Sequence, residues 1–373
     1  MTIRKILATL LALSMTLSLA ACDGNSTQTD TTAPSERTEE SSSVSDESAS
    51  DETTAENTET ETPSDETEAS EPAEKVDINL AALSGPTALG MLDLLEKNEN
   101  GEAANNYNVT IATAPDEVTG KIISGELDIA AVPTNVASTL YNKTEGQVQI
   151  AALNTMGVLY VLETGDTIQS VADLAGKTIY ATGQGSTPEY ALNLVLEKNG
   201  LTPGEDVEIV FAADNAEIAP LLASGEAQVA LLPQPFVTSV LTQNENVRVA
   251  LDLTEEWDKA VNGESGLTMG CVVVRKEFAE QNKEALDRFL DEYKQSVETV
   301  TSEEGLAHAA ELAEHYNIIK AAVAEKAIPE CNIVFVEGDE MQQIAGGFLQ
   351  VLYDANPQAV GGQLPNDDFY YKR

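Results

Sequence analysis

The chain is poor in histidine, cysteine, aromatic residues and basic residues. Its 373 residues include two histidines, three cysteines and one tryptophan, and aromatic residues make up 5%. Lysine and arginine number 20 against 63 aspartates and glutamates, which gives a formal net charge of −43. A nucleic acid or an anionic lipid surface needs a basic face on its partner. The composition therefore predicts that the protein does not bind nucleic acid.

Recognisable catalytic and nucleotide-binding motifs are also missing. The sequence has no Gly-x-Ser-x-Gly elbow and no readable pair of nucleophile and base. The run "AGKTIY", which begins at Ala175, resembles a phosphate loop, but Val171 stands where the first glycine belongs and a strand follows. His308 and His315 lie two turns apart on a predicted helix, where a solvated surface is a better interpretation than a metal site. We predict a protein without catalysis, metal or cofactor.

Apolar runs long enough to cross a bilayer are missing as well. The run at residues 6–19 follows Arg4 and Lys5 and leads into "LAAC", which ends at Cys22. It is too short for a membrane span and has a small-residue cleavage site, so residues 1–21 are predicted to be a secretory signal peptide. A cysteine directly after the site resembles a bacterial lipobox, which predicts lipid on Cys22. A plain signal peptide with an unrelated cysteine is the alternative.

The next segment, residues 22–75, has almost no apolar residues to bury. Between residues 23 and 74 there are 17 acidic residues and one basic residue, and Val44 is the only large aliphatic side chain. Such a segment cannot offset the entropy of ordering, so it is predicted to be a disordered acidic tether. Residues 75–373 keep 46 acidic and 17 basic residues, a net charge of −29. Their number suits two lobes better than a single core.

A repeat with a period near 100 residues organises the folded part. "SGELDIAAVP" begins at Ser124 and "SGEAQVALLP" begins at Ser224, each after a helix-like stretch. "INLAALSGPTALGMLDLLEKN" and "TIYATGQGSTPEYALNLVLEKNG" likewise share a strand, a small polar loop and a helix that ends in Leu-Glu-Lys-Asn. The alternation of strands and helices predicts two similar α/β lobes with largely parallel sheets. Gly125 and Gly225 are predicted to end helices before buried strands.

Two strand-like runs fall outside the repeat, at residues 157–163 and 268–278. Both lie where the chain would cross between lobes. We therefore assign residues 76–163 and 264–373 to lobe one and residues 164–263 to lobe two. The helices after residue 278 are expected to pack on lobe one. Cys271 and Cys331 are either a disulfide or two buried thiols, because their spacing has no signature.

Small polar loops follow the predicted strands, where open α/β sheets bind ligands. Thr187, followed by Pro188, is predicted to cap a helix whose free N–H groups hold an anionic oxygen without any lysine or arginine. Ser84 or Thr87 would do the same in lobe one. The alternative is that these residues are ordinary helix caps. The predicted ligand-binding residues are Ser84, Gly85, Pro86, Thr87, Thr134, Asn135, Thr155, Met156, Gly185, Ser186, Thr187, Asp214, Asn215 and Gln234.

The segment "SVADLAGKTIYATGQGSTPEYALNLVLEKNGLTPGEDVEIVFA", from Ser170, resembles the nitrate/sulfonate/taurine-type substrate-binding proteins of ABC importers. The shared features are Asp-Leu-x-Gly-Lys, the Gly-Ser loop and a helix that ends in Asn-Gly-Leu. The resemblance implies a two-lobe periplasmic-binding-protein-like fold of type II, with two crossing strands and no catalysis. Relatives often carry an acidic residue where this chain has Gln234, and some anion-binding relatives use an arginine or lysine that these loops lack.

The resemblance implies an extracytoplasmic, membrane-anchored lipoprotein that is a monomer and delivers a small solute to an ABC permease. A sulfonate, taurine or nitrate type of solute is expected. The family also takes pyrimidine and flavin precursors, usually with aromatic side chains, of which Tyr160, Tyr190, Phe236 and Trp257 are the few available here. A ligand-sensing subunit of a signalling system is a further alternative. A two-lobe enzyme is disfavoured because a metal, a nucleophile and a base are missing.

Overall fold

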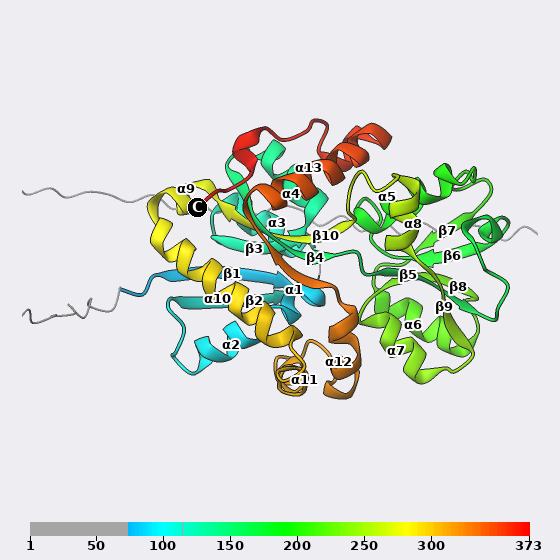
Figure 1. Cartoon of the computed structure of the whole chain (residues 1–373), viewed down its shortest axis with the longest axis horizontal. Helices are drawn as coiled ribbons and strands as arrows, with labels where there is room; N and C mark the ends of the chain where they lie inside the picture. Colours follow the sequence, from blue (N-terminus) through cyan, green and yellow to red (C-terminus); the bar gives the residue numbers. More distant parts are fainter. Residues whose placement is uncertain (1–73, 114) are drawn as a thin grey trace, which may run out of the picture. The chain divides into compact units, whose positions relative to one another are not determined.

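The computed structural model describes residues 74–113 and 115–373 of the chain (Figure 1). The predictions for the signal peptide, for Cys22 and for the tether up to residue 73 lie outside these residues. Within the described part the strands form two sheets, one of six strands and one of five. Each sheet with its helices is one lobe, as the repeat predicts.

The sheet of lobe one has the strand order β11-β4-β10-β3-β1-β2. Its members are β1 (Asp77–Leu83), β2 (Asn106–Ala112), β3 (Ile129–Pro133), β4 (Val148–Met156), β10 (Thr268–Arg275) and β11 (Ile333–Val336). β1 pairs in parallel with β2 and β3. β10 lies antiparallel between β3 and β4. β11, which the sequence did not predict, extends the edge beside β4.

The sheet of lobe two has the strand order β7-β6-β8-β5-β9. Its members are β5 (Leu159–Thr164), β6 (Thr178–Ala181), β7 (Glu208–Phe211), β8 (Val229–Pro233) and β9 (Val247–Asp252). β6 pairs in parallel with β7 and β8, whereas β5 lies antiparallel between β8 and β9. The two sheets therefore have the same arrangement, apart from β11.

The lobes exchange one strand each. β5 follows the last strand of the first repeat but joins the second sheet, and β10 follows the second repeat but joins the first sheet. These are the two runs that fall outside the repeat. The sequence assigned residues 157–163 to lobe one, whereas the pairing places β5 in lobe two. The sheets are also not wholly parallel as expected, because the exchanged strands β5 and β10 enter from the opposite direction and β11 is antiparallel to β4.

The helices of the repeats occupy matching places along the chain. They are α1 (Pro86–Leu89), α2 (Leu92–Glu99), α3 (Pro115–Ser124) and α4 (Thr134–Lys143) in the first repeat, and α5 (Thr187–Lys198), α6 (Asn215–Ser224) and α7 (Phe236–Gln243) in the second. α8 (Leu253–Ala260) follows β9 and has no counterpart after β4. The helix expected after the first polar loop is thus two helices, α1 and α2, which meet at Gly90 and Met91. The Cβ of a larger residue at position 90 would lie 3.0 Å from Ile333, so the break lets the chain approach β11 closely.

The repeated Ser-Gly-Glu phrase ends a helix in both lobes. Gly125 and Gly225 directly follow α3 and α6 and have φ angles of 80° and 79°. A residue with a side chain adopts this left-handed conformation only at a cost, so glycine is favoured there. The phrase therefore marks the same helix-to-strand turn twice, as predicted.

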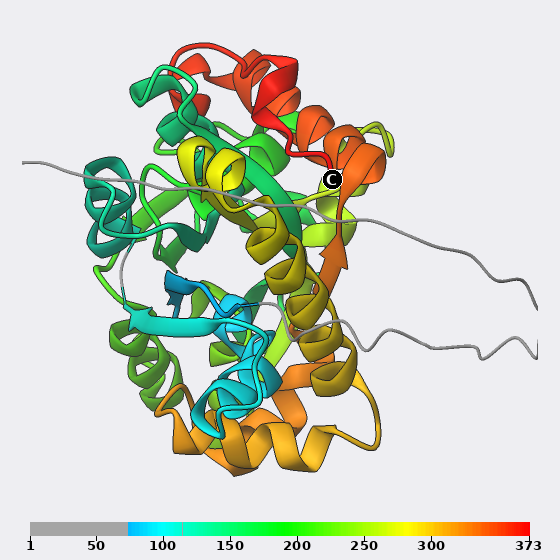
Figure 2. The same cartoon turned by 90° about the vertical axis from the view of Figure 1, so that its left-hand side faces the viewer.

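The chain after β10 is mostly helical. Its elements are α9 (Lys276–Gln281), α10 (Lys283–Thr301), α11 (Leu306–His315), α12 (Ala321–Ala327) and α13 (Gly338–Ala355), with short 3₁₀ turns at Ile328–Glu330, Pro357–Val360 and Asp367–Phe369. A fourth 3₁₀ turn, Val171–Leu174, precedes β6. α10 runs diagonally across lobe one in Figure 2 and contacts α2 and β11. Within the described residues, none of the helices is both long and apolar enough to span a membrane.

Side-chain alternation along the strands divides the core of lobe one between the two faces of its sheet. In β10, Val272 and Val274 pack in the apolar cluster that includes Phe289 of α10. Cys271 and Val273 belong to the cluster on the other side, beneath α4 and α13. Residues two apart share a face of a strand, which explains the division. Helices therefore cover both faces, as an α/β sheet requires.

The last helix, α13, contacts both lobes. Its Phe348 packs against Trp257 of α8, with ring centroids 5.6 Å apart, and both side chains are fully buried. The indole N–H of Trp257 donates to the carbonyl of Ser265, 2.9 Å away, in the segment that leads to β10. The terminal helices were expected to pack on lobe one, and α13 in addition packs on lobe two through this contact.

An ion pair with a buried carboxylate connects β5 with β9 in lobe two. Glu163, which is 2% exposed, accepts from Arg248 Nη2 at 2.8 Å and from the backbone amides of Thr167 and Ile168. Burial alone would raise the pKa of Glu163, but the Thr167 hydroxyl, these amides and Arg248 together lower it below its usual value. The carboxylate therefore stays charged although it is buried.

The two cysteines of the folded part are separate thiols. Cys271 and Cys331 are both buried and unbonded. Burial raises the pKa of each thiol, to about 12 for Cys331, so neither is a reactive thiolate at neutral pH. Of the two alternatives left open by the sequence, the structure shows the buried thiols.

Candidate functional site

A cavity of about 200 Å³ lies between the lobes at the carboxyl ends of the parallel strands. Lobe one contributes Leu83, Ser84, Gly85, Pro86, Thr87, Pro133, Thr155 and Met269. The β4–β5 crossing and lobe two contribute Val158, Ser186, Thr187, Pro188, Asn215, Pro233, Gln234 and Phe236. No charged side chain is among these described residues. The cavity is therefore lined by uncharged residues of both lobes. Such an enclosed position between two lobes suits the binding of a small solute.

Nine of the predicted ligand-binding residues lie together in this lining. They are Ser84, Gly85, Pro86, Thr87, Thr155, Ser186, Thr187, Asn215 and Gln234. The rule that ligands bind beyond the carboxyl ends of strands brings them to one place, because both lobes turn those ends toward the crossing. Their role in binding stays a prediction.

Two predicted residues, Thr134 and Asn135, lie buried behind the lining rather than in it. Asn135 is 2% exposed, and its amide nitrogen donates to the carbonyl of Ala359, 3.2 Å away. Its amide oxygen accepts from the hydroxyl of Thr187 at 3.1 Å. Thr134 shares a 3.1 Å hydrogen bond with the hydroxyl of Thr268. Asn135 therefore links the lobes directly, from α4 to the start of α5.

The other three, Met156, Gly185 and Asp214, also lie outside the lining. The Met156 methyl group lies where it would be 3.2 Å from a Cβ at Gly266. Gly185 is exposed, and Asp214 is an exposed residue that caps α6 by accepting from the amide of Ala216. The place of these residues in the sequence, near the ends of strands, does not show whether they line the cavity.

Several lining residues were not predicted, namely Leu83, Pro133, Val158, Pro188, Pro233, Phe236 and Met269. Most are the apolar neighbours of predicted polar residues, so including whole loops would have found them. Met269 is different because it belongs to β10, the exchanged strand. Only the exchange places it beside the loops of the first repeat.

The start of α5 differs from the prediction. The helix begins at Thr187, so Ser186 holds the capping position and Pro188 is the second helical residue. The Ser186 hydroxyl donates to the carbonyl of Gly183 at 2.7 Å instead of capping the helix. Glu189 in the first turn accepts from the Gly185 amide at 2.5 Å. The carboxylate of Glu189 therefore already offsets part of the positive helix end.

Four hydroxyl groups of the lining donate their single proton to the protein itself. Thr87 donates to the carbonyl of Leu83 at 2.6 Å, and Thr155 donates to the amide oxygen of Asn154 at 3.2 Å. Ser186 and Thr187 make the bonds to Gly183 and Asn135 described above. A hydroxyl has one proton and two lone pairs, so each oxygen can still accept a hydrogen bond.

The free donors of the lining are side-chain amides of lobe two. The Gln234 oxygen accepts from both the amide and the hydroxyl of Thr238, and the Asn215 oxygen accepts from the Thr182 hydroxyl at 2.8 Å. These bonds fix which end of each amide is the NH₂ group. Neither NH₂ group has a hydrogen-bond partner in the described part of the chain, so both are available to a solute. The hydroxyl of Ser84 is likewise unpaired there.

Two fully buried polar side chains of lobe one, Asn154 and Tyr293, lie outside the lining. The amide nitrogen of Asn154 and the hydroxyl of Tyr293 are fully buried without a hydrogen-bond partner among the described residues. Burial raises the pKa of Tyr293, so its hydroxyl keeps its proton. A Cβ at Gly270 would lie 2.5 Å from the Asn154 oxygen and 3.0 Å from Thr87. Glycine at position 270 therefore lets these side chains pack against β10.

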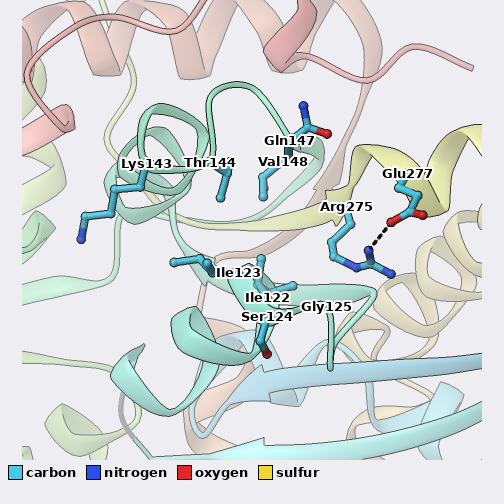
Figure 3. A pocket seen from close by; sticks show the side chains of 10 residues that line it. All are labelled: Ile122, Ile123, Ser124, Gly125, Lys143, Thr144, Gln147, Val148, Arg275 and Glu277. Carbon is cyan, nitrogen blue, oxygen red and sulfur yellow. Dashed lines mark hydrogen bonds and ion pairs between the residues drawn. The ribbon is translucent and has the colours of Figure 1, made fainter.

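A second cavity, of about 390 Å³, lies at the amino end of the sheet of lobe one (Figure 3). Its most polar member, Arg275, donates to the carbonyl of Leu127 and to the carboxylates of Asp128 and Glu277. Lys143 points away from Arg275 in Figure 3. This cavity has walls from one lobe, and its arginine is engaged by the protein, so it is the weaker candidate for a solute site.

The two histidines do not form a metal site. His308 lies 2.8 Å from Glu96 and His315 lies 3.2 Å from Glu99, so both pair with α2 on an exposed surface. Within the described residues there is no group of three or more histidine, cysteine or acidic side chains placed to hold a metal ion.

Comparison with known proteins decides the class. The profile of the family described as "ABC transporter, phosphonate, periplasmic substrate-binding protein" matches residues 93–325, which span both lobes. The chain belongs to this family. No curated protein matches it. The predicted class, a periplasmic solute-binding component of an ABC transporter, is confirmed, whereas the matched family is named for phosphonate rather than for nitrate, sulfonate or taurine.

Solved structures confirm the fold of this binding protein. An ABC transporter protein from Parabacteroides distasonis is 24% identical, with a TM-score of 0.66, over 79% of this chain and 99% of that one. The periplasmic aliphatic sulphonate binding protein SsuA from Escherichia coli is 14% identical, with a TM-score of 0.63, over 79% and 92%. The alkanesulfonate-binding protein SsuA from Xanthomonas axonopodis pv. citri, bound to MOPS, is 16% identical, with a TM-score of 0.60, over 79% and 96%.

Proposed function

We propose that this protein captures a small, singly charged organic anion of the sulfonate type between its lobes and delivers it to its ABC permease. The observation that carries the proposal is the neutral cavity between the lobes, with NH₂ groups on Asn215 and Gln234 that have no partner among the described residues. Neutral donors in a site shielded from water can hold an oxyanion without a cationic side chain. The named ligands of the two SsuA proteins support the choice of a sulfonate.

The charges of the folded part and of the cavity lining favour a solute with one negative charge over a solute with two. The folded part has a net charge of −29, and the described lining offers no lysine or arginine to offset a second negative charge. A buried charge needs nearby donors or an opposite charge, and two amides with one hydroxyl are few for a dianion. A sulfonate keeps one charge at neutral pH, so it fits this set of donors.

A neutral precursor of a vitamin is the second candidate. Phe236, Met269 and Val158 are apolar members of the lining, and an uncharged ring such as a pyrimidine could pack against them. The same amides would then bind the ring carbonyl groups. This candidate differs from the first in one respect that can be tested, the charge of the solute.

Replacing Ser186 with glutamate is expected to weaken a sulfonate by at least about 2 kcal/mol, roughly thirtyfold, because like charges would meet in the cavity. Ser186→Gln is the matched control, since it adds similar bulk without charge. Calorimetric titration of both variants with propane-1-sulfonate, together with thermal melts, measures the effect. Equal affinity for the two variants would contradict an anionic solute and favour the neutral one.

We also propose that lipid on Cys22 and the acidic segment after it tether the domain to the outer face of the cell membrane. The lipobox-like "LAAC" supports this, and a lipoprotein anchor of two or three acyl chains binds firmly. Cys22→Ser is expected to move the protein from the membrane fraction to the soluble fraction. If the variant stays with the membranes after cell fractionation, another segment must anchor it.

A further inference from the structure

The helix after the first polar loop is broken where the corresponding helix of lobe two is continuous. α1 and α2 meet at Gly90 and Met91, whereas α5 runs from Thr187 to Lys198 without a break. Both segments end in Leu-Glu-Lys-Asn, and alignment on this ending places Ala191 of α5 opposite Gly90. The break is therefore a property of lobe one and not of the repeated unit.

A side chain of α10 lies in the break. The hydroxyl of Ser296, which is fully buried, donates to the carbonyl of Gly90 at 2.8 Å and accepts from the backbone amide of Leu94 at 3.2 Å. In a continuous helix the amide of Leu94 would donate directly to the carbonyl of Gly90, because the two residues are four positions apart. A side chain inserted between such groups kinks a helix. The direction of α1 relative to α2 therefore depends on a residue 206 positions after Gly90.

We propose that Ser296 is a positioning residue of the solute site, which sets the place of the loop that lobe one contributes to the cavity. Pro86 and Thr87 belong both to α1 and to the lining, and one turn of helix separates Thr87 from Gly90. Ser296 itself is not part of the lining, so it acts through α1. The inference rests on the proposed function for the identity of the solute, and it adds a residue outside the cavity to those that determine affinity.

The surroundings of Gly90 hold the break closely. A Cβ at this position would lie 3.0 Å from Ile333 of β11 and 3.3 Å from the hydroxyl of Tyr293 of α10. Apolar packing of this kind has no preferred direction, whereas a hydrogen bond requires a particular angle. Ser296 bonds to both sides of the break, so it fixes the orientation that packing alone leaves open.

Removing the hydroxyl would change the position of the loop. The carbonyl of Gly90 and the amide of Leu94 would lose their partner at a buried position, which is costly. They could pair with each other only if α1 and α2 straightened, and that would turn Thr87 away from its place in the lining. If the break stayed, two unpaired groups would loosen the junction. In both cases the loop from Ser84 to Thr87 is no longer held ready for the solute.

The test compares Ser296→Ala with the wild type, both as the full chain. Calorimetric titration with propane-1-sulfonate, at a temperature at which thermal melts show both proteins folded, is expected to give about tenfold weaker binding for the variant. Hydrogen exchange followed by mass spectrometry is expected to be faster in peptides that cover residues 84–90, with no change in lobe two. The exchange measurement needs no solute, so it reports the position of the loop by itself.

Three further variants separate positioning from stability. Val300→Ala removes buried packing one turn further along α10, and it should lower stability without weakening binding. Ser296→Thr keeps the hydroxyl and should bind more tightly than Ser296→Ala. Gly90→Ala keeps Ser296 but pushes the junction away from Ile333, so it should also weaken binding. This last variant keeps the test valid if Ser296→Ala does not fold.

The outcomes separate this inference from the proposed function. If Ser296→Ala folds, binds as tightly as the wild type and exchanges at the same rate, the inference is wrong. It is also wrong if Val300→Ala weakens binding as much, because affinity would then follow stability. If the wild type does not bind propane-1-sulfonate, the proposed sulfonate function fails. The exchange of residues 84–90 then decides whether Ser296 positions the loop, and an unchanged rate in Ser296→Ala would contradict it.

Discussion

Replacing Trp257 with alanine is expected to lower the free energy of unfolding by about 3–5 kcal/mol, the usual cost of removing a large aromatic side chain from a core. Trp257 is fully buried, packs against Phe348 of α13 and donates to the carbonyl of Ser265. The substitution therefore creates a cavity and leaves a buried carbonyl unpaired. The lost contact lies where α13 packs on both lobes. We therefore expect both lobes of the variant to unfold at a lower temperature than those of the wild type.

The measurement is chemical denaturation followed by circular dichroism. Tryptophan fluorescence cannot follow the variant, because Trp257 is the only tryptophan in the sequence. Trp257→Phe is the control, since it keeps most of the packing and should lose clearly less stability. A Trp257→Ala protein as stable as the wild type would show that α13 does not hold the lobes together through this contact.

Replacing Asn135 with aspartate is expected to cost about 3–5 kcal/mol at neutral pH, the usual penalty for an uncompensated buried charge. One carboxylate oxygen could still accept from Thr187, but the other would face the carbonyl of Ala359, where the wild-type amide donates. The site is 2% exposed, so water cannot relieve this repulsion. The variant therefore weakens the contact that links α4 to α5.

The loss of stability in Asn135→Asp should depend on pH and shrink as the pH falls. Burial raises the pKa of the new carboxyl group in the folded state, so the deficit relative to the wild type is full at neutral pH. As the pH falls through that raised pKa, the protonated carboxyl group can donate to Ala359 and the deficit should shrink. Thr187→Val, which adds no charge, should lose less stability and show no such recovery. Denaturation curves from pH 5 to 8 compare the three proteins, and a deficit independent of pH would contradict the explanation.

The two-lobe fold could be predicted from the repeat, but the strand exchange could not. The repeated phrase around Gly125 and Gly225 marks a backbone conformation that depends on neighbouring residues, so the sequence reports it directly. β5 and β10 are apolar runs without a periodic signal for their partners. Their direction in the sheet depends on contacts more than 70 residues away, such as the pairing of Leu159 with Pro233.

The location of the cavity could likewise be predicted, whereas its hydrogen-bond polarity could not. Ser84, Thr87, Ser186 and Thr187 were found because they follow strands. The partner of each hydroxyl depends on rotamers, and the bond from Thr187 to Asn135 joins residues of different lobes. The sequence therefore identified donors and acceptors by type, but only the structure shows that four hydroxyl groups have already donated their proton.

Native mass spectrometry of the protein purified from its own cells tests the central claim, that one solute is held between the lobes. We predict a fraction with the mass of the protein plus one small molecule, in which the bound molecule carries a sulfonate group. Ser186→Glu, prepared in the same way, should lose this fraction. A wild-type protein without any bound molecule, under conditions in which the variant is also folded, would contradict the claim, and so would equal occupancy in the variant.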